Sequence, residues 1–200
     1  MFGTISNRKR DLITEIGSVL TFSAINNNDK VGVIFFSNKI EKYIPAKKGR
    51  QHALYIVREL LSKEPKSKGT QISPALRFFN NATRQTSIAF ILSDFLDANY
   101  ETALRIAGKK HDVIGIKLYD KMDMQLPDAG LLHVQDAESG NTKWVDSSNE
   151  FVRQQYQQEF FRVTEYSTQT FKKAGSELLH LRTDEDYVKV LQKFFISRNR

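Results

Sequence analysis

Two short segments of the chain, Val31–Phe36 and residues 88–92, contain no polar side chain. Runs of this length that lack polar alternation are typical of strands buried on both faces. Patterns of apolar residues at helical spacing surround them, and Ser73-Pro74 predicts a helix start, with serine as the cap. This alternation predicts a doubly wound, Rossmann-like α/β sheet. The predicted helices cover about 7–25, 54–61, 73–81, 98–108 and 152–171, and a last one starts near Thr183.

The remaining apolar segments complete one domain over residues 1–200. Residues 40–44 alternate apolar and charged side chains, as an edge strand does. Residues 113–118 and 177–181 are predicted to be further strands. Between about 120 and 147 the alternation stops, and two apolar segments flank Glu138-Ser139-Gly140-Asn141. This spacing predicts a small β-hairpin insertion.

The composition excludes several classes of protein. The 200 residues include no cysteine, which excludes disulfides, thiolate metal sites and cysteine nucleophiles. No apolar run approaches the roughly 20 residues of a membrane span, and no signal-peptide pattern opens the chain, so we expect a cytoplasmic protein. The net charge of +7 arises within residues 1–68, where 13 Lys and Arg accompany 6 Asp and Glu. This predicts either a solvated basic surface or a binding surface for an acidic partner.

Common catalytic and phosphate-binding motifs are absent. The sequence contains no G-x-x-x-x-G-K-[ST], G-x-G-x-x-G, G-x-S-x-G or H-E-x-x-H. No two of the four histidines share a helical turn. We predict structural roles with satisfied hydrogen bonds for His111 and His180, and either a structural or an anion-binding role for His52.

Two carboxylates, Asp94 and Asp97, follow the predicted strand at residues 88–92. In sheets of this class, ligands bind at the carboxyl ends of the strands. Carboxylate oxygens suit a hard cation such as Mg²⁺, and Thr70 in its glycine-led loop adds a hydroxyl oxygen. The alternative is an Asp that caps a helix and a threonine that bonds the backbone. The residues alone leave both interpretations open.

Segments along the whole chain resemble one family in a single order. They are residues 27–37, 45–52, 68–70, 92–97, 111–114, 126–130, 136–140 and 183–186. On these residues the chain resembles the bacterial domain of unknown function 58 family. Its members are similar to von Willebrand factor type A domains and are commonly encoded beside MoxR-type AAA+ ATPases.

The resemblance implies a von Willebrand factor A-type sheet with a metal-ion-dependent adhesion site at its carboxyl edge. Such a site takes Asp-x-Ser-x-Ser from the first strand, a Thr from a second loop and an Asp from a third. Thr70 matches the second element and Asp94 the third, with Asp97 as a weaker supporting carboxylate. A partner's carboxylate completes the ion's coordination in such sites. The resemblance therefore implies a non-enzymatic protein-binding module that works with a MoxR-type ATPase in protein assembly or maturation.

The chain departs from the family at its start. Family members carry the first strand and its Asp-x-Ser-x-Ser immediately upstream of a segment like Phe2-Gly3-Thr4, so we expect this chain to be N-terminally truncated. The lost strand is central in the family. We expect either that segments 31–36 and 88–92 close on each other, or that the chain dimerises, swaps strands or aggregates through the exposed edges. With two protein ligands left, we expect weak or no Mg²⁺ binding by this chain, and Mg²⁺ as a cofactor only of the complete protein.

Other functions remain as alternatives. Lys47, Lys48 and Arg50 are predicted to form part of a partner-binding surface. A metal-dependent phosphoesterase or nuclease would use Asp94, Asp97 and Asp120, since such chemistry needs several converging carboxylates. Nucleic-acid binding by the basic first third is a further alternative, although its basic residues are not interleaved with the aromatics on which single strands stack.

Overall fold

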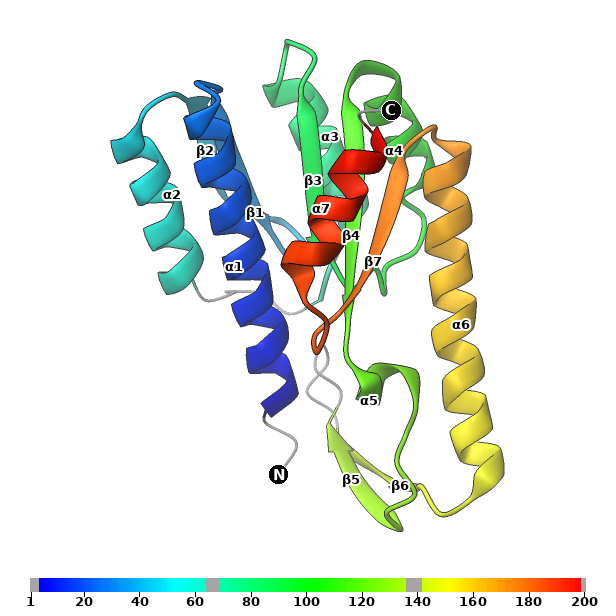
Figure 1. The fold of residues 1–200 in the computed structure, drawn as a ribbon. Helices are drawn as coiled ribbons and strands as arrows, with labels where there is room; N and C mark the ends of the chain where they lie inside the picture. Colours follow the sequence, from blue (N-terminus) through cyan, green and yellow to red (C-terminus); the bar gives the residue numbers. More distant parts are fainter. Residues whose placement is uncertain (1–3, 64–68, 136–141, 199–200) are drawn as a thin grey trace.

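The computed structural model describes residues 4–63, 69–135 and 142–198, which form an α/β fold (Figure 1). The helices are α1 (Thr4–Asn26), α2 (Arg50–Ser62), α3 (Ile72–Ala82), α4 (Glu101–Lys110), α5 (Lys121–Met124), α6 (Glu150–Lys173) and α7 (Tyr187–Arg198). The strands are β1 (Val31–Phe36), β2 (Ile40–Lys47), β3 (Ile88–Ser93), β4 (Asp112–Tyr119), β5 (Leu131–Gln135), β6 (Thr142–Asp146) and β7 (Glu177–Arg182). The features predicted at Phe2-Gly3, at Lys68 and at residues 136–141 lie outside the described residues.

Within the described residues the strands form three separate sheets. β3, β4 and β7 are parallel and lie in the order β3-β4-β7. β1 and β2 form an antiparallel pair, and β5 and β6 form the predicted hairpin. β1 is not paired with β3, so the edge of each strand that faces the other has no strand partner in the described part of the chain. Figure 1 shows the resulting separation between the two sheets.

Helices cover both faces of the parallel sheet because its strands are apolar on both sides. One cluster joins α1 and α7 to the sheet and contains Leu12, Ile16, Ile116, Leu118, Leu181 and Leu191. A second cluster joins α3, α4 and α6 to the opposite face and includes Leu76, Ile91, Phe95, Leu104, Val113 and Phe171. Two of these helices also reach the β1–β2 pair. α1 packs against α2 and β1 on one side, and α3 packs against β1 and β2 on the other.

β4 is the most deeply buried strand, with partners on both edges and residues 113–118 all buried. Gly115 permits the close approach of α6 and β7 to its surface. A Cβ atom at this position would lie 2.6 Å from Phe171 Cζ and 2.6 Å from Leu178 Cδ1. Both neighbours belong to the packed face of the sheet, so neither has free space into which to move.

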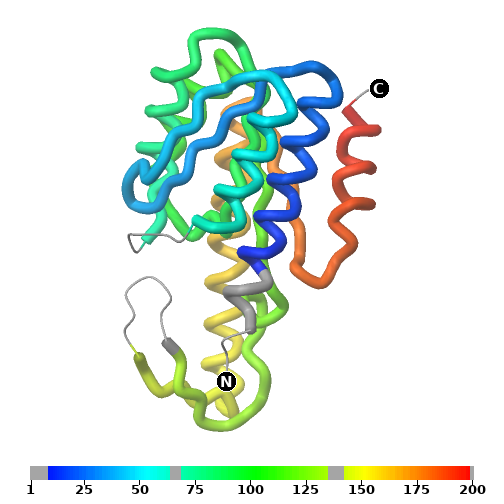
Figure 2. Tube along the Cα trace, turned by 90° about the vertical axis from the view of Figure 1, so that its left-hand side faces the viewer, coloured from blue at the N-terminus to red at the C-terminus, as the bar shows by residue number. Residues whose placement is uncertain are grey.

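The β5–β6 hairpin and the first turns of α6 project beyond the rest of the domain (Figures 1 and 2). The Tyr156 hydroxyl of α6 donates a hydrogen bond to the Met122 carbonyl of α5 at 3.0 Å. On the hairpin, the rings of His133 and Trp144 lie 4.7 Å apart between centroids, and Trp144 is 64% exposed. The insertion predicted over residues 120–147 is therefore an arm that extends from the carboxyl ends of the strands.

Four expectations were wrong. Ser73 does not cap α3, because the helix begins at Ile72 and the Asp97 carboxylate accepts the Ile72 N–H at 2.6 Å. The last helix begins at Tyr187, since residues 183–185 form a turn that closes against β7. Segment 31–36 is not buried on both faces: its apolar side chains are only half-buried, because it pairs on one edge only. Nor do segments 31–36 and 88–92 close on each other.

Substitution of Gly115 tests the packing of β4. We expect Gly115→Ala to lower the free energy of unfolding by about 1–3 kcal/mol, because the added methyl group overlaps Phe171 and Leu178. Gly17→Ala is the matched control. Its Cβ would meet only the flexible end of Leu60 at 3.1 Å, and alanine favours the helix by about 1 kcal/mol. Urea denaturation measures both variants; equal stability of the two would contradict this account.

Candidate functional site

The carboxyl ends of β1 and β3 meet at one edge of the domain. Ser37, which follows β1, accepts a backbone hydrogen bond from Gln71 at 2.9 Å. Ile72, the next residue and the first of α3, donates its N–H to Asp97, which follows β3. The loop that carries Thr70 therefore connects the ends of the two strands, as the parallel arrangement predicts.

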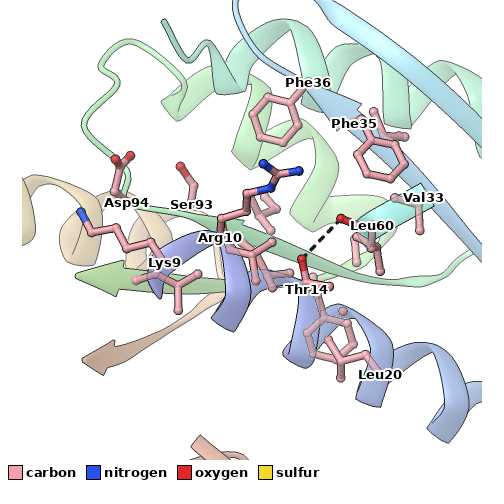
Figure 3. Close-up of a pocket in the computed structure, with 18 of the residues that line it drawn as sticks. Lys9, Arg10, Thr14, Leu20, Val33, Phe35, Phe36, Leu60, Ser93 and Asp94 are labelled. Carbon is pink, nitrogen blue, oxygen red and sulfur yellow. Dashed lines mark hydrogen bonds between the residues drawn. The ribbon is translucent and has the colours of Figure 1, made fainter. Parts of the chain in front are cut away.

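Thr70 and Asp94 line the same cavity, and both are half-buried. The cavity has a volume of about 3210 Å³; it runs between the β1–β2 pair and the parallel sheet and continues along the β5–β6 arm and α7. Lys9 and Arg10 of α1 also line it, as does Ser93 (Figure 3). The structure thus brings the two predicted ligand residues to one opening, but this opening is far larger than a site for a single ion.

The carboxylate of Asp97 has a structural role. Its Oδ2 accepts the Ile72 N–H, and its Oδ1 accepts the Ala98 N–H at 2.7 Å. Such bonds satisfy backbone donors at the start of α3, which has no side-chain cap of its own. The expected capping of the helix near Asn99 was wrong, because α4 has no side-chain cap, and Asp97 instead satisfies the first N–H of α3.

The Asp120 carboxylate is also bonded to structural groups. Its side chain caps α5 through the Met122 N–H at 3.0 Å and accepts the Thr183 hydroxyl at 2.6 Å. Residues 4–63, 69–135 and 142–198 contain no group of three or more His, Asp or Glu side chains placed to hold a metal ion. Thr70 and Asp94 alone fit Mg²⁺ poorly, because this ion gives up its water ligands reluctantly.

The sequence analysis did not identify Lys117, which is buried at this edge and is 1% exposed. Its ammonium group donates a hydrogen bond to the main-chain carbonyl of Asp94 and lies 5.8 Å from the Phe160 ring centroid. Burial lowers the pKa of Lys117 to about 8, while the nearby Asp94 carboxylate opposes this shift. The available signal was a single lysine inside the apolar run 113–118. Lys117 therefore fixes the backbone that carries the candidate ligand Asp94.

Several basic residues of the first third are paired with acidic side chains. Lys9 binds Asp123 at 2.5 Å, and Lys42 binds Glu59 at 2.7 Å. Much of the excess charge remains on the surface, and three of its exposed residues follow one another at the end of β2 and the start of α2. They are Lys47, Lys48 and Arg50.

Contacts among the described residues indicate structural roles for His52 and His180. The His52 Nε2 lies 2.9 Å from the Val31 carbonyl, and the His180 Nε2 lies 3.3 Å from the Thr168 hydroxyl. Burial lowers the pKa of His180, with a further contribution from Lys117. The expected hydrogen bond of His111 was wrong: its ring is buried, and neither ring nitrogen has a hydrogen-bond partner among the described residues.

Sequence comparison places this arrangement in a family. Residues 1–166 match the model of a family described as "Protein of unknown function DUF58". The chain belongs to the DUF58 family. Its relatives include an uncharacterized protein of Mycobacterium tuberculosis, 29% identical over 202 residues, which cover all of this chain and 63% of that protein. An uncharacterized protein of Mycobacterium avium is 28% identical over 165 residues, which cover 78% of this chain and 94% of the relative.

A solved structure resembles this DUF58 domain in fold. It is a conserved hypothetical protein, BatB from Bacteroides thetaiotaomicron, with a TM-score of 0.56 and 17% identity over 92% of this chain and 87% of that one. In length, the DUF58 domain spans 63% of its Mycobacterium tuberculosis relative. None of the described helices is long and apolar enough to cross a membrane.

The buried lysine makes stability depend on pH. In the unfolded chain Lys117 keeps its ordinary pKa of 10.5, against about 8 in the fold, so the unfolded state holds more protons between these values. The free energy of unfolding should therefore rise by about 2 kcal/mol from pH 7 to pH 9.5. Above pH 10 the buried Tyr100 opposes the rise, because burial raises its pKa.

Urea denaturation across this pH range isolates the effect of the lysine. Lys117→Met should remove the rise, whereas Lys109→Met, at an exposed position on α4, should retain it. A rise of equal size in both variants would assign the pH dependence to other groups.

Metal binding is tested by calorimetric titration with Mg²⁺ and Mn²⁺. We expect no binding at micromolar concentration, because residues 4–63, 69–135 and 142–198 bring no third side-chain ligand to Thr70 and Asp94. Micromolar affinity that disappears in Asp94→Ala and persists in Asp128→Ala, at an exposed carboxylate on the arm, would contradict this expectation.

Proposed function

We propose that this DUF58 domain is a non-enzymatic protein-interaction module that acts as an adaptor or partner of a MoxR-type AAA+ ATPase in protein assembly or maturation. The observation that supports it most is the arrangement of the carboxyl edge. Thr70 and Asp94 line an open cavity, while the carboxylates of Asp97 and Asp120 are bonded to structural groups. Metal-assisted hydrolysis needs groups that converge on one reacting bond. Two groups at a wide opening suit recognition better than catalysis.

The nature of the partner follows from the resemblance to von Willebrand factor A-like domains encoded beside MoxR-type ATPases. In this proposal Thr70 and Asp94 are two of the residues that face the partner at this opening. Lys117 contributes indirectly, because its hydrogen bond to the Asp94 carbonyl holds the loop in place.

The basic segment at the end of β2 supplies a second part of the proposed surface. Lys47, Lys48 and Arg50 are all exposed, at the end of β2 and the start of α2, within the first third of the chain that carries the charge excess. Clustered charge of one sign accelerates association with an oppositely charged surface and favours the correct orientation. The proposed contact is therefore an acidic surface of the ATPase.

Charge reversal tests the proposed surface. The double variant Lys47→Glu/Lys48→Glu should weaken binding to a purified MoxR-type ATPase of the same organism at least tenfold, because repulsion replaces attraction. Its matched control is Lys172→Glu/Lys173→Glu, which reverses two exposed charges at the end of α6. Biolayer interferometry measures both affinities. Equal affinity of both variants would exclude this surface, and no binding by the unmodified protein would exclude the ATPase as partner.

A further inference from the structure

The amino ends of the parallel strands carry basic side chains that the candidate site does not use. The ends of α3, α4 and α6 lie at this end of the domain, because each of these helices directly precedes β3, β4 or β7 (Figure 1). Exposed basic residues occur at all three helix ends. We call them the basic edge, and they are Arg84, Lys109, Lys110, Lys172 and Lys173.

The antiparallel pair adds further positive charge at the same end of the domain. Lys47 at the end of β2 pairs with Val31 at the start of β1. The carboxyl ends of β1 and β3 lie together at the opposite end, since the chain at the start of α3 bonds to the residues that follow both. Lys30, Lys47 and Lys48, which are all exposed, therefore lie at the same end as the basic edge.

The basic side chains at the two ends of the domain differ in their surroundings. At the carboxyl ends of the strands, Lys121 and Arg182 both bind the carboxylate of Asp184. No residue of the basic edge forms an ion pair in the part of the chain that the structure describes. The two acidic residues at the starts of β4 and β7 are both bound by Arg198. The positive charge of the basic edge is therefore available to an anionic partner.

Exposed apolar side chains accompany these charges. Ile106 is 52% exposed and lies one turn before Lys109 and Lys110 on α4. Ile196 in the last turn of α7 is 60% exposed, and Arg198 of the same turn binds Asp112 at the start of β4. A nucleic-acid backbone offers charge with little apolar surface. A membrane that contains anionic lipids offers phosphate groups with acyl chains directly beneath them.

We propose that the basic edge binds the surface of a membrane that contains anionic phospholipids. Its lysine and arginine side chains contact the lipid phosphates, while Ile106 and Ile196 contact the boundary with the acyl chains. The opening lined by Thr70 and Asp94, at the opposite end of the strands, then faces away from the lipid. This proposal goes beyond the interaction role and does not depend on it.

Sedimentation of the 200-residue protein with lipid vesicles tests the proposal. We expect binding to phosphatidylcholine vesicles that contain about 30% phosphatidylglycerol, and none to vesicles of phosphatidylcholine alone, because charge supplies most of the attraction. Binding should be lost at ~0.5 M NaCl, since salt screens exposed charges. Equal binding to both kinds of vesicle, or no binding to either, would overturn the proposal.

Charge reversal locates the contact on the domain. The reversal variant carries three substitutions at the basic edge, Lys109→Glu, Lys172→Glu and Lys173→Glu. The control variant makes the same change in net charge near the opposite end, in the β1–β2 turn, on α5 and on β6, through Lys39→Glu, Lys121→Glu and Lys143→Glu.

The reversal variant should weaken vesicle binding roughly tenfold or more, and the control variant should weaken it far less. Replacement of the same three lysines of the basic edge by glutamine avoids repulsion at the helix ends and should weaken binding to an intermediate degree. Thermal melts followed by circular dichroism check that each variant is folded. Equal weakening by the reversal and control variants would overturn the assignment to the basic edge.

An apolar substitution separates lipid from other polyanions. Ile196→Asn should weaken binding to the anionic vesicles a few-fold, because it removes an apolar contact, whereas Leu131→Asn on the arm, at a residue that is 62% exposed, should not. A short DNA duplex that binds more tightly than the vesicles, with no effect of Ile196→Asn, would assign the basic edge to nucleic acid and overturn the proposal. ATPase binding is measured without lipid, so failure of either proposal is recognised without the other.

Discussion

An apolar strand in a layered α/β domain is stable when helices cover both faces and neighbouring strands satisfy both edges. β4 meets both conditions, with β3 and β7 beside it and clusters of helical side chains on each face. Helices also cover β1 and β3, but the edge of each that faces the other has no neighbouring strand among the described residues. The large cavity, the half-buried side chains of β1 and the exposure of Ile88 all follow from this difference.

The same constraint shapes the candidate site. Because the strands are parallel, their carboxyl ends bring Thr70 and Asp94 to one opening although 24 positions separate them in the sequence. The buried Lys117 then holds the Asp94 backbone from the neighbouring strand β4. Asp97 and Asp120 instead stabilise helix starts. Asp94, Asp97 and Asp120 all follow strands of the parallel sheet. Their carboxylates nevertheless have different roles, because different backbone N–H groups lie near each of them.

The sequence predicted the order and type of the elements well, because each depends on a local pattern of apolar residues. It predicted the β5–β6 hairpin and the strand ends that meet at the site for the same reason. The features that the sequence did not predict depend on tertiary contacts. Asp97 replaces Ser73 as the group that satisfies the start of α3 from 25 positions away, and His111 lacks the expected hydrogen bond. The half-buried state of segment 31–36 depends on which strands are present, a property of the whole sheet that no local pattern contains.

The connection between the β1–β2 pair and the parallel sheet runs through α1 and α3 and not through a strand ladder. Side-chain packing resists sliding less strongly than a continuous row of backbone hydrogen bonds. We therefore expect the part formed by β1, β2 and α2, which is the more basic one, to open locally before the parallel sheet.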